Sequence, residues 1–239
     1  MTESKSQYAV VLGISIFFGF FILGYLLSNA IIKFKEFERT VTAKGLSERE
    51  VEADIVIWPI KFTIAGNELT EIYNSIEANI EEIRDFLTTN GISLNEISYS
   101  IPSIVDRIAQ QYGSTSRPEL RYTASQTVTV YSKNISTVRK LMSRLLTLGK
   151  KGIVFSSDDY QSQTEYIYTR LNEIKPEMIE EATNNAREVA NKFAADSQSR
   201  LGKIKKASQG QFSINDRDKN NPHIKKVRVV STVEYYLVD

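Results

Sequence analysis

The chain has 239 residues, of which 25% are charged and 41% hydrophobic, and its formal net charge is +1. This balance is typical of a globular protein. It argues against a largely disordered chain and gives no overall electrostatic pull towards nucleic acid. The absence of cysteine excludes disulfides and thiolate chemistry.

The chain begins with a long apolar segment from Tyr8 to Ile32, whose three glycines are of a kind common in membrane helices. About 20 apolar residues suffice to cross the hydrocarbon core of a bilayer. A buried core helix is the alternative, but a fully apolar helix at a chain terminus has little to bury against. We therefore predict a transmembrane segment over residues 8–32, preceded by a short tail over residues 1–7.

Two further questions concern this segment, its cleavage and its orientation. The apolar run is too long for a secretory signal and residues 27–30 make a poor cleavage site, so we expect an uncleaved signal anchor, with a cleaved signal as the open alternative. The positive-inside rule weighs Lys5 against Lys33, Lys35 and Arg39. Taken alone, this count favours a cytoplasmic C-terminal part.

Alternation and helical periodicity identify the first elements after a linker over residues 33–40. Residues 41–65 alternate between apolar and polar side chains and predict two strands, in which Pro59 marks an edge position, a bulge or a break. Apolar residues at spacings of three and four predict a helix over residues 67–90, with Asn67 as its N-cap and Gly91 as its left-handed stop.

The remaining elements follow from the same signals. The longest helix carries a stripe of small side chains, including Ala182 and Ala186, which would allow a partner surface to approach closely. In chain order we predict a strand near Ile101, a loop over Gln110–Pro118, a strand over Leu120–Ser132, a helix over Asn134–Leu148, a strand over Ile153–Tyr168, a helix over Leu171–Leu201 ended by Gly202, and strands over Lys206–Ile214 and Lys225–Val238 joined by a turn.

Paired strands separated by helices predict the fold class. We expect an α+β fold, mainly antiparallel sheet with helices packed on one face in β-β-α units, preceded by one N-terminal transmembrane helix. The α+β part is expected as one domain over residues 41–239.

No catalytic constellation is found. His223 is the only histidine, so it cannot build a multi-histidine metal site, and its polar turn predicts a solvated side chain. Asp216, Asp218 and Asn220 begin like a calcium loop, but the required Gly and Glu are missing, and we reject an EF-hand. We therefore predict no catalytic, cofactor-binding or metal-binding residues.

Other charged motifs have simpler explanations. The Lys150-Lys151 pair lacks the Walker A spacing and suits a turn after a helix, while Asn134 suits a helix cap better than a glycosylation site. The basic clusters could meet phosphates, but without interleaved aromatic residues a solvated surface is the better interpretation. These clusters are Lys203, Lys205 and Lys206, and Lys225, Lys226 and Arg228.

Several stretches, taken in order, resemble the SIMPL domain family, also called DUF541, which includes bacterial periplasmic immunogenic proteins. Ala43 stands where the family's opening strand has its first Gly, and Ala53 where its x-P-D-x element has Pro. The matching stretches are Val41-Thr-Ala-Lys-Gly45, Glu52-Ala-Asp-Ile55, Asn90-Gly91-Ile92 followed by Glu96-Ile97, Tyr122-Thr-Ala-Ser-Gln-Thr-Val-Thr-Val130, and Asn185-Ala-Arg187 with Ala190, Ala194 and Leu201-Gly-Lys203.

This resemblance implies an α+β domain, self-association in some members, export to the envelope, and no known active site. It implies stress tolerance as a role in bacteria. Export conflicts with the charge count around the anchor, and we follow the resemblance because the charge bias is small. We therefore expect a single-pass protein of the bacterial inner membrane with a periplasmic C-terminal domain and no cofactor, and a homo-oligomer or an unknown protein as partner rather than nucleic acid.

The leading hypothesis from the sequence is a non-enzymatic, membrane-anchored envelope protein that acts by self-assembly or partner binding. An enzyme is a second hypothesis, with a carboxylate and tyrosine site such as Asp158, Asp159 and Tyr160, although adjacent aspartates on a strand point to opposite faces. A third is a ligand- or lipid-binding module with an apolar pocket between the helices and the sheet.

Overall fold

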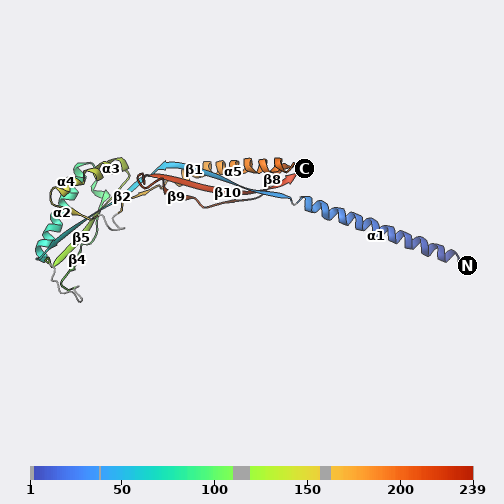
Figure 1. The fold of residues 1–239 in the computed structure, drawn as a ribbon, viewed down its shortest axis with the longest axis horizontal. Helices are drawn as coiled ribbons and strands as arrows, with labels where there is room; N and C mark the ends of the chain where they lie inside the picture. Colours follow the sequence, from blue (N-terminus) through green and yellow to red (C-terminus); the bar gives the residue numbers. More distant parts are fainter. Residues whose placement is uncertain (1–2, 38, 110–118, 157–162, 239) are drawn as a thin grey trace. The chain divides into compact units, whose positions relative to one another are not determined.

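The computed structural model describes residues 3–37, 39–109, 119–156 and 163–238, and it divides the chain into two compact units (Figure 1). Unit 1 comprises Met1–Glu48, Lys175–Phe212 and Arg228–Asp239, and unit 2 comprises Arg49–Ile174 and Ser213–Val227. The predicted single domain over residues 41–239 stays a prediction, as do the boundaries of the tail and linker. The loop predicted at 110–118 lies outside the described residues.

The fold is α+β with antiparallel sheets, as predicted. The elements in chain order are α1 (Glu3–Phe37), β1 (Thr40–Glu52), β2 (Ile55–Gly66), α2 (Leu69–Thr89), the 3-10 turn η1 (Leu94–Glu96), β3 (Ile97–Tyr99), β4 (Ser103–Asp106), β5 (Tyr122–Ser132), α3 (Ile135–Arg144), α4 (Leu146–Gly149), β6 (Val154–Phe155), β7 (Glu165–Ile167), α5 (Leu171–Asp196), β8 (Arg200–Gln209), β9 (Ser213–Asp216) and β10 (Ile224–Val238).

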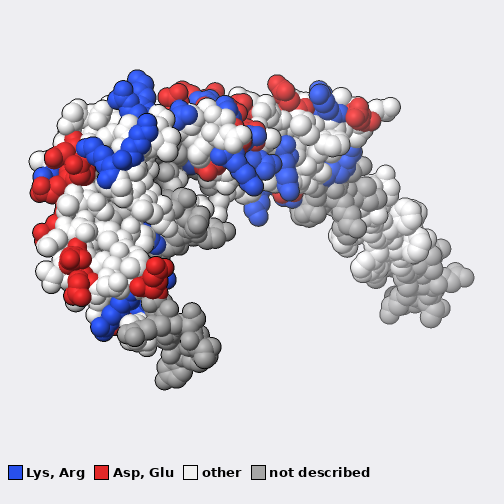
Figure 2. Space-filling model, turned by 60° about the vertical axis from the view of Figure 1, so that its left-hand side comes forward, with Lys and Arg blue, Asp and Glu red and all other residues white. Residues whose placement is uncertain are grey.

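The N-terminal helix α1 is apolar and uncovered. Its segment Gly13–Ala30 has a mean hydropathy of 1.7 and no buried residue. Large side chains such as Phe17 and Phe20 are exposed, and Gly13–Ala30 contains no Lys, Arg, Asp or Glu, so this segment is white in Figure 2. By length and composition the helix can serve as a membrane anchor or as a signal sequence.

Unit 2 is built on a sheet of order β3-β5-β2-β6, in which β4 also pairs with β5 and β7 with β2. The long central pair runs in register from Val56 opposite Ser132 to Gly66 opposite Tyr122. Alternate side chains of β2 and β5 pack under α2 and α3 into one hydrophobic core. Phe62 and Val128 in this core are fully buried, and Trp58 joins them.

Pro59 shows why β2 tolerates a proline. It is paired with Thr129 of β5, so the strand continues through it. On the other side, β7 pairs with residues 55–57 of β2 and β6 with residues 62–63, so Pro59 lies in the interval between them. Because proline has no N–H to donate, this interrupted edge is a position it can occupy, so of the three predicted alternatives the structure shows the edge position rather than a bulge or a break.

The first helix of unit 2 follows its predicted stripe but not its predicted cap. Ile72, Ile76, Ile83 and Leu87 are its buried residues, as the spacing required. Its N-cap is Glu68, without a side-chain cap bond. The cap predicted at Asn67 is therefore wrong. Its Oδ1 accepts a hydrogen bond from the backbone N–H of Arg121 at 3.0 Å and anchors the start of β5 instead.

Two helix ends were predicted correctly in kind. Gly91 has φ +93°, the left-handed conformation that favours glycine at a helix stop. Asn134 caps α3, because its side chain accepts from the backbone N–H of Thr137. The strand predicted near Ile101 is displaced. Ile101 is 90% exposed and, with Pro102, separates the short strands β3 and β4.

The sheet of unit 1 has the order β1-β10-β8, with β9 also paired to β10. One face carries α5, whose alanines at intervals of four residues are buried. A Cβ on Gly45 would lie 1.9 Å from the carbonyl oxygen of Ala182 and 2.3 Å from the backbone nitrogen of Ala186. The backbones of β1 and α5 thus approach as closely as the small-residue stripe predicted, and only glycine fits at position 45.

The end of α5 corrects a second prediction. The helix stops at Asp196 rather than Leu201, and Gly202 lies inside β8. Gln198 takes the left-handed conformation with φ 56°. The backbone N–H of Gln198 donates to Ala195 and that of Ser199 to Ala194, which is the Schellman pattern. The end of α5 was not predicted, because the left-handed position after the helix, where glycine is usual, is occupied by Gln198.

Candidate functional site

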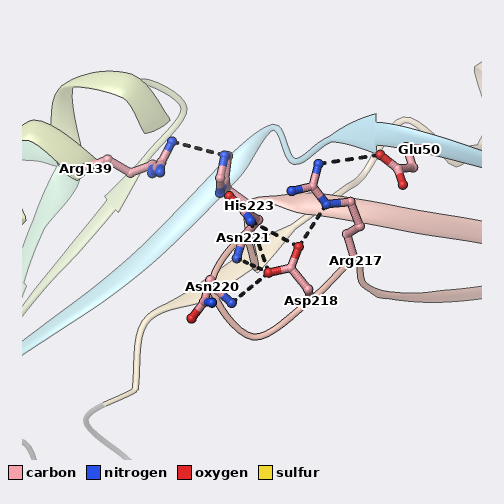
Figure 3. Close-up of polar contacts among 7 residues, drawn as sticks. All are labelled: Glu50, Arg139, Arg217, Asp218, Asn220, Asn221 and His223. Atoms are coloured by element: carbon pink, nitrogen blue, oxygen red, sulfur yellow. Dashed lines mark hydrogen bonds and ion pairs between the residues drawn. The ribbon is translucent and has the colours of Figure 1, made fainter.

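A network of polar contacts in unit 2 surrounds His223, in the turn that leads into β10 (Figure 3). Arg139 of α3 places a guanidinium nitrogen 3.0 Å from His223 Nε2. A guanidinium can only donate, so Nε2 accepts and the ring proton lies on Nδ1. The ring of Tyr166, from β7, packs edge-on at 6.0 Å between centroids. His223 therefore joins three segments and is half-buried, which corrects the prediction of a solvated side chain.

The surroundings of His223 disfavour its protonated form. Burial is the main cause of its lowered pKa, and the positive charge of Arg139 adds to it. The backbone of the same residue is also engaged, since its carbonyl accepts from the N–H of Ala53 at 2.9 Å. The neutral ring is thus a structural acceptor, and among the residues that the structure describes neither a carboxylate nor a nucleophile bonds to it as in a catalytic triad.

Asp218 closes the turn beside His223. Its Oδ1 accepts from the backbone N–H groups of Asn220 and Asn221, both at 2.9 Å, and its Oδ2 accepts from Arg217 Nε at 2.9 Å. These bonds to the charged form lower the pKa of Asp218 to about 2. A guanidinium nitrogen of Arg217 also lies 3.7 Å from Glu50 Oε2, which ties the turn to β1.

The residues that resemble the start of a calcium loop are therefore not assembled as ligands. Asp216 pairs with Lys225, while the carboxylate oxygens of Asp218 accept hydrogen bonds within the turn. In the part of the chain that the structure describes, no three His, Cys, Asp or Glu side chains gather into a metal-binding group. Lys225 is itself buried, so the second basic cluster is not the fully solvated surface that was predicted.

A pocket of about 500 Å³ with a mixed polar and apolar lining lies at the turn between β1 and β2. One of its lining residues is Asp54, whose carboxylate accepts from the backbone N–H of Thr169 at 3.0 Å and from its hydroxyl at 3.0 Å. Arg170 Nε lies 3.4 Å from the same carboxylate. The pocket is lined by Glu52, Ala53, Asp54, Ile55, Lys133, Thr169 and Arg170. Charges of both signs line it, which suits a small polar ligand rather than a lipid chain.

Other residues singled out in the sequence either lie outside the described residues or have simpler surroundings. Asp158, Asp159 and Tyr160 lie outside the described residues, so the carboxylate and tyrosine site stays a hypothesis. Lys151 pairs with Glu82 on the surface of α2, which agrees with a turn after a helix. The Arg139–His223 contact was missed, because no local pattern signals a pair separated by 84 residues.

The motif residues have structural roles. Asp54 of the Glu52–Ile55 stretch bonds the turn before β2 to residues 169–170, directly ahead of α5. Gly45 of the opening strand admits the backbone of α5. Asn185 donates from Nδ2 to the carbonyl of Leu46 at 2.8 Å. Gly45 and Asn185 hold β1 against α5, and Asp54 holds the turn after β1 to the residues just before α5. These three residues thus have structural roles.

Comparison with known families gives a match over most of the chain. The family described as SIMPL, a protein of unknown function (DUF541), matches residues 41–233. The chain therefore belongs to this family. No curated protein matches the chain.

Proposed function

We propose that this member of the SIMPL family is a membrane-anchored, non-enzymatic protein of the bacterial envelope, whose α+β part lies on the periplasmic side and acts by self-assembly or by binding another protein. The observation that carries the proposal is the exposed apolar helix α1. Its segment Gly13–Ala30 buries nothing within the molecule, and exposed apolar surface of this extent requires a membrane or a partner.

The polar groups of unit 2 support a role without catalysis. His223, Asp218 and Asp54 each spend their polar atoms on backbone or arginine partners that hold turns in place. Catalytic acids and bases instead keep their polar atoms within reach of a substrate. We extend the proposal to stress tolerance of the envelope, as the family resemblance implies.

The ligand-binding alternative has weaker support. The side chains between the sheet and the helices of unit 2, among them Phe62, Ile83 and Leu87, are fully buried and fill that space. An apolar ligand would have to displace them. The pocket at Asp54 is the better place for a ligand, since the cationic side chains of Lys133 and Arg170 line it.

Fractionation of cells that express the full chain tests the anchor. We expect the protein in the membrane fraction after alkaline or high-salt washing, and its release only by detergent. Protease added to spheroplasts should remove the α+β part, and intact cells should protect it. Recovery in the soluble fraction with a shortened N-terminus would show a cleaved signal instead, and protection in spheroplasts would place the α+β part in the cytoplasm.

A further inference from the structure

The sheet of unit 1 ends in two strands with open edges, β1 and β8, at opposite ends of its described order. β10 lies between them and is antiparallel to β8, with Val233 opposite Ala207. It is also antiparallel to β1, because the N–H of Leu237 donates to the carbonyl of Arg39 while that of Ala53 donates to His223. The two open strands therefore run parallel to each other.

On the face of the sheet where α5 covers β1 and β10, the strand β8 is left uncovered. All but two of its ten residues are exposed. Ile204 lies opposite Tyr235 and so faces the α5 side of the sheet, yet it is 44% exposed. The small core under α5 contains residues of β1 and β10, and β8 adds only the partly buried Leu201.

At the other end of the sheet, α5 extends beyond the edge of β1. The carbonyl of Arg39 is bonded to β10, and the odd-numbered side chains from position 43 to 47 stay buried, so the even-numbered residues of β1 direct their backbone groups to the open edge. The carbonyl of Leu46 is one of these, and Asn185 of α5 donates to it. The side of α5 that carries Asn185 therefore overhangs the open edge.

Val189 and Phe193 continue this overhanging side, because residues four apart lie on one side of a helix. Phe193 is 56% exposed and Val189 is also exposed. The opposite side of α5 faces the β8 end of the sheet, where the amino group of Lys175 lies over the ring of Phe212. At the β1 edge of unit 1, α5 therefore extends over a position that no strand occupies. At the other edge, the strand β8 has no helix covering it.

We propose that these two edges bind each other between copies, so that β8 of one copy joins β1 of the next beneath the overhanging side of α5. Val189 and Phe193 would then cover Ile204 and Ala207 of the neighbour. The charges agree, because β8 carries Lys203, Lys205 and Lys206, while Glu181 and Glu177 precede Asn185 by four and eight residues on the overhanging side of α5.

The direction of the strands selects this arrangement over a two-fold one. β1 begins three residues after α1 ends, so in copies anchored in one bilayer every β1 runs away from the membrane. Two-fold pairing of β1 with β1, or of β8 with β8, would place the anchors at opposite ends. Parallel pairing of β8 with β1 keeps them together, and such a head-to-tail contact builds a ring or an open row. This inference rests on the proposed anchored assembly.

Thiol crosslinking tests the contact, because the natural chain has no cysteine. The full chain is prepared in membranes with Phe193→Cys, with Ile204→Cys, or with both, and treated with a short thiol crosslinker. We expect no crosslinked product from either single variant, dimers when the two are co-expressed, and a ladder of higher multimers from the double variant. Leu146→Cys, at an exposed position of unit 2, is the matched control and should give no crosslinked product when it is co-expressed with Phe193→Cys or with Ile204→Cys.

The possible outcomes distinguish the proposed β8–β1 contact from self-assembly by some other contact. Dimers from a single variant would show a two-fold contact and overturn the inference. A multimeric mass by light scattering without crosslinking between positions 193 and 204 would overturn this contact and leave self-assembly standing, whereas a monomeric mass would overturn both. As a second measurement, Phe193→Lys should lower the mass by placing a cation against the basic β8, while Leu146→Lys should leave it unchanged.

Discussion

At the scale of single residues, the structure turns sequence motifs into steric and electrostatic requirements. Gly45 is conspicuous in the sequence only as part of a short pattern, yet its missing side chain is what lets α5 lie directly on β1. His223 looked like a solvated turn residue and is instead a neutral acceptor held by Arg139. Both roles depend on contacts between residues far apart in the sequence, and only the small-residue stripe of α5 gave a local sign of the first one.

Gly45→Ala should destabilise unit 1 strongly. The new methyl group would lie 1.9 Å from a backbone oxygen of α5, which cannot move aside as a flexible side chain could. Overpacking of this kind costs about 1–3 kcal/mol or more, and urea unfolding should show the loss. Gly149→Ala is the control, because nothing lies within 4 Å of a Cβ there. Equal stability of the two variants would contradict the close approach.

Stability should fall with acid through the titration of His223. Its pKa in the folded state is below the usual 6.5, so the unfolded chain binds the proton more readily. The free energy of unfolding is then greatest above about pH 6.5 and declines as the pH falls through the folded pKa. The charged groups around the ring are Arg139, Glu52, Arg217 and Asp218.

This decline is measured by urea unfolding between pH 7.5 and pH 5, in the natural chain and in His223→Gln. The variant keeps a side-chain acceptor for Arg139 but does not titrate, so its stability should change less over this range. Because the chain has one histidine, its pKa can also be followed directly by NMR. A folded-state pKa above 6.5 would contradict the account.

At the scale of elements, long periodic segments were predictable, and their ends were predictable only where a usual cap or stop residue marks them. The stripe of α2, the alternation of β5 and the Asn134 cap of α3 follow from local spacing. The end of α5 does not, because Gln198 adopts a conformation that glycine usually fills. The short strands β3 and β4 pair with β5, and β6 and β7 pair with β2. These pairings join residues far apart in the sequence, so no local pattern predicts them.

The Asp54 carboxylate makes the most concentrated contact between elements. It bonds the turn between β1 and β2 to Thr169 and Arg170, immediately before α5. Asp54→Ala should lower the free energy of unfolding by about 1–3 kcal/mol, the usual cost of leaving such donors unpaired. Glu173→Ala, which removes only a surface pair with Arg170, should cost less than about 1 kcal/mol. Similar losses in both variants would rule out the role given to Asp54.

At the scale of the whole molecule, the chain combines an exposed apolar helix with a sheet that has two open edges. The fold class and the family could be predicted, because both rest on patterns that extend along most of the chain. The division into two units could not, since β1, α5 and β10 each contribute residues to both and show no break in periodicity there. The open edges likewise follow from strand order, which the sequence does not display.

The central claim is that anchored copies of this chain assemble with one another. Its most direct test is the mass of the full chain, purified from membranes in a mild detergent and measured by light scattering with the contribution of the detergent subtracted. The account predicts a discrete species containing several copies, which Phe193→Lys reduces in mass. A single copy at all accessible protein concentrations would contradict it.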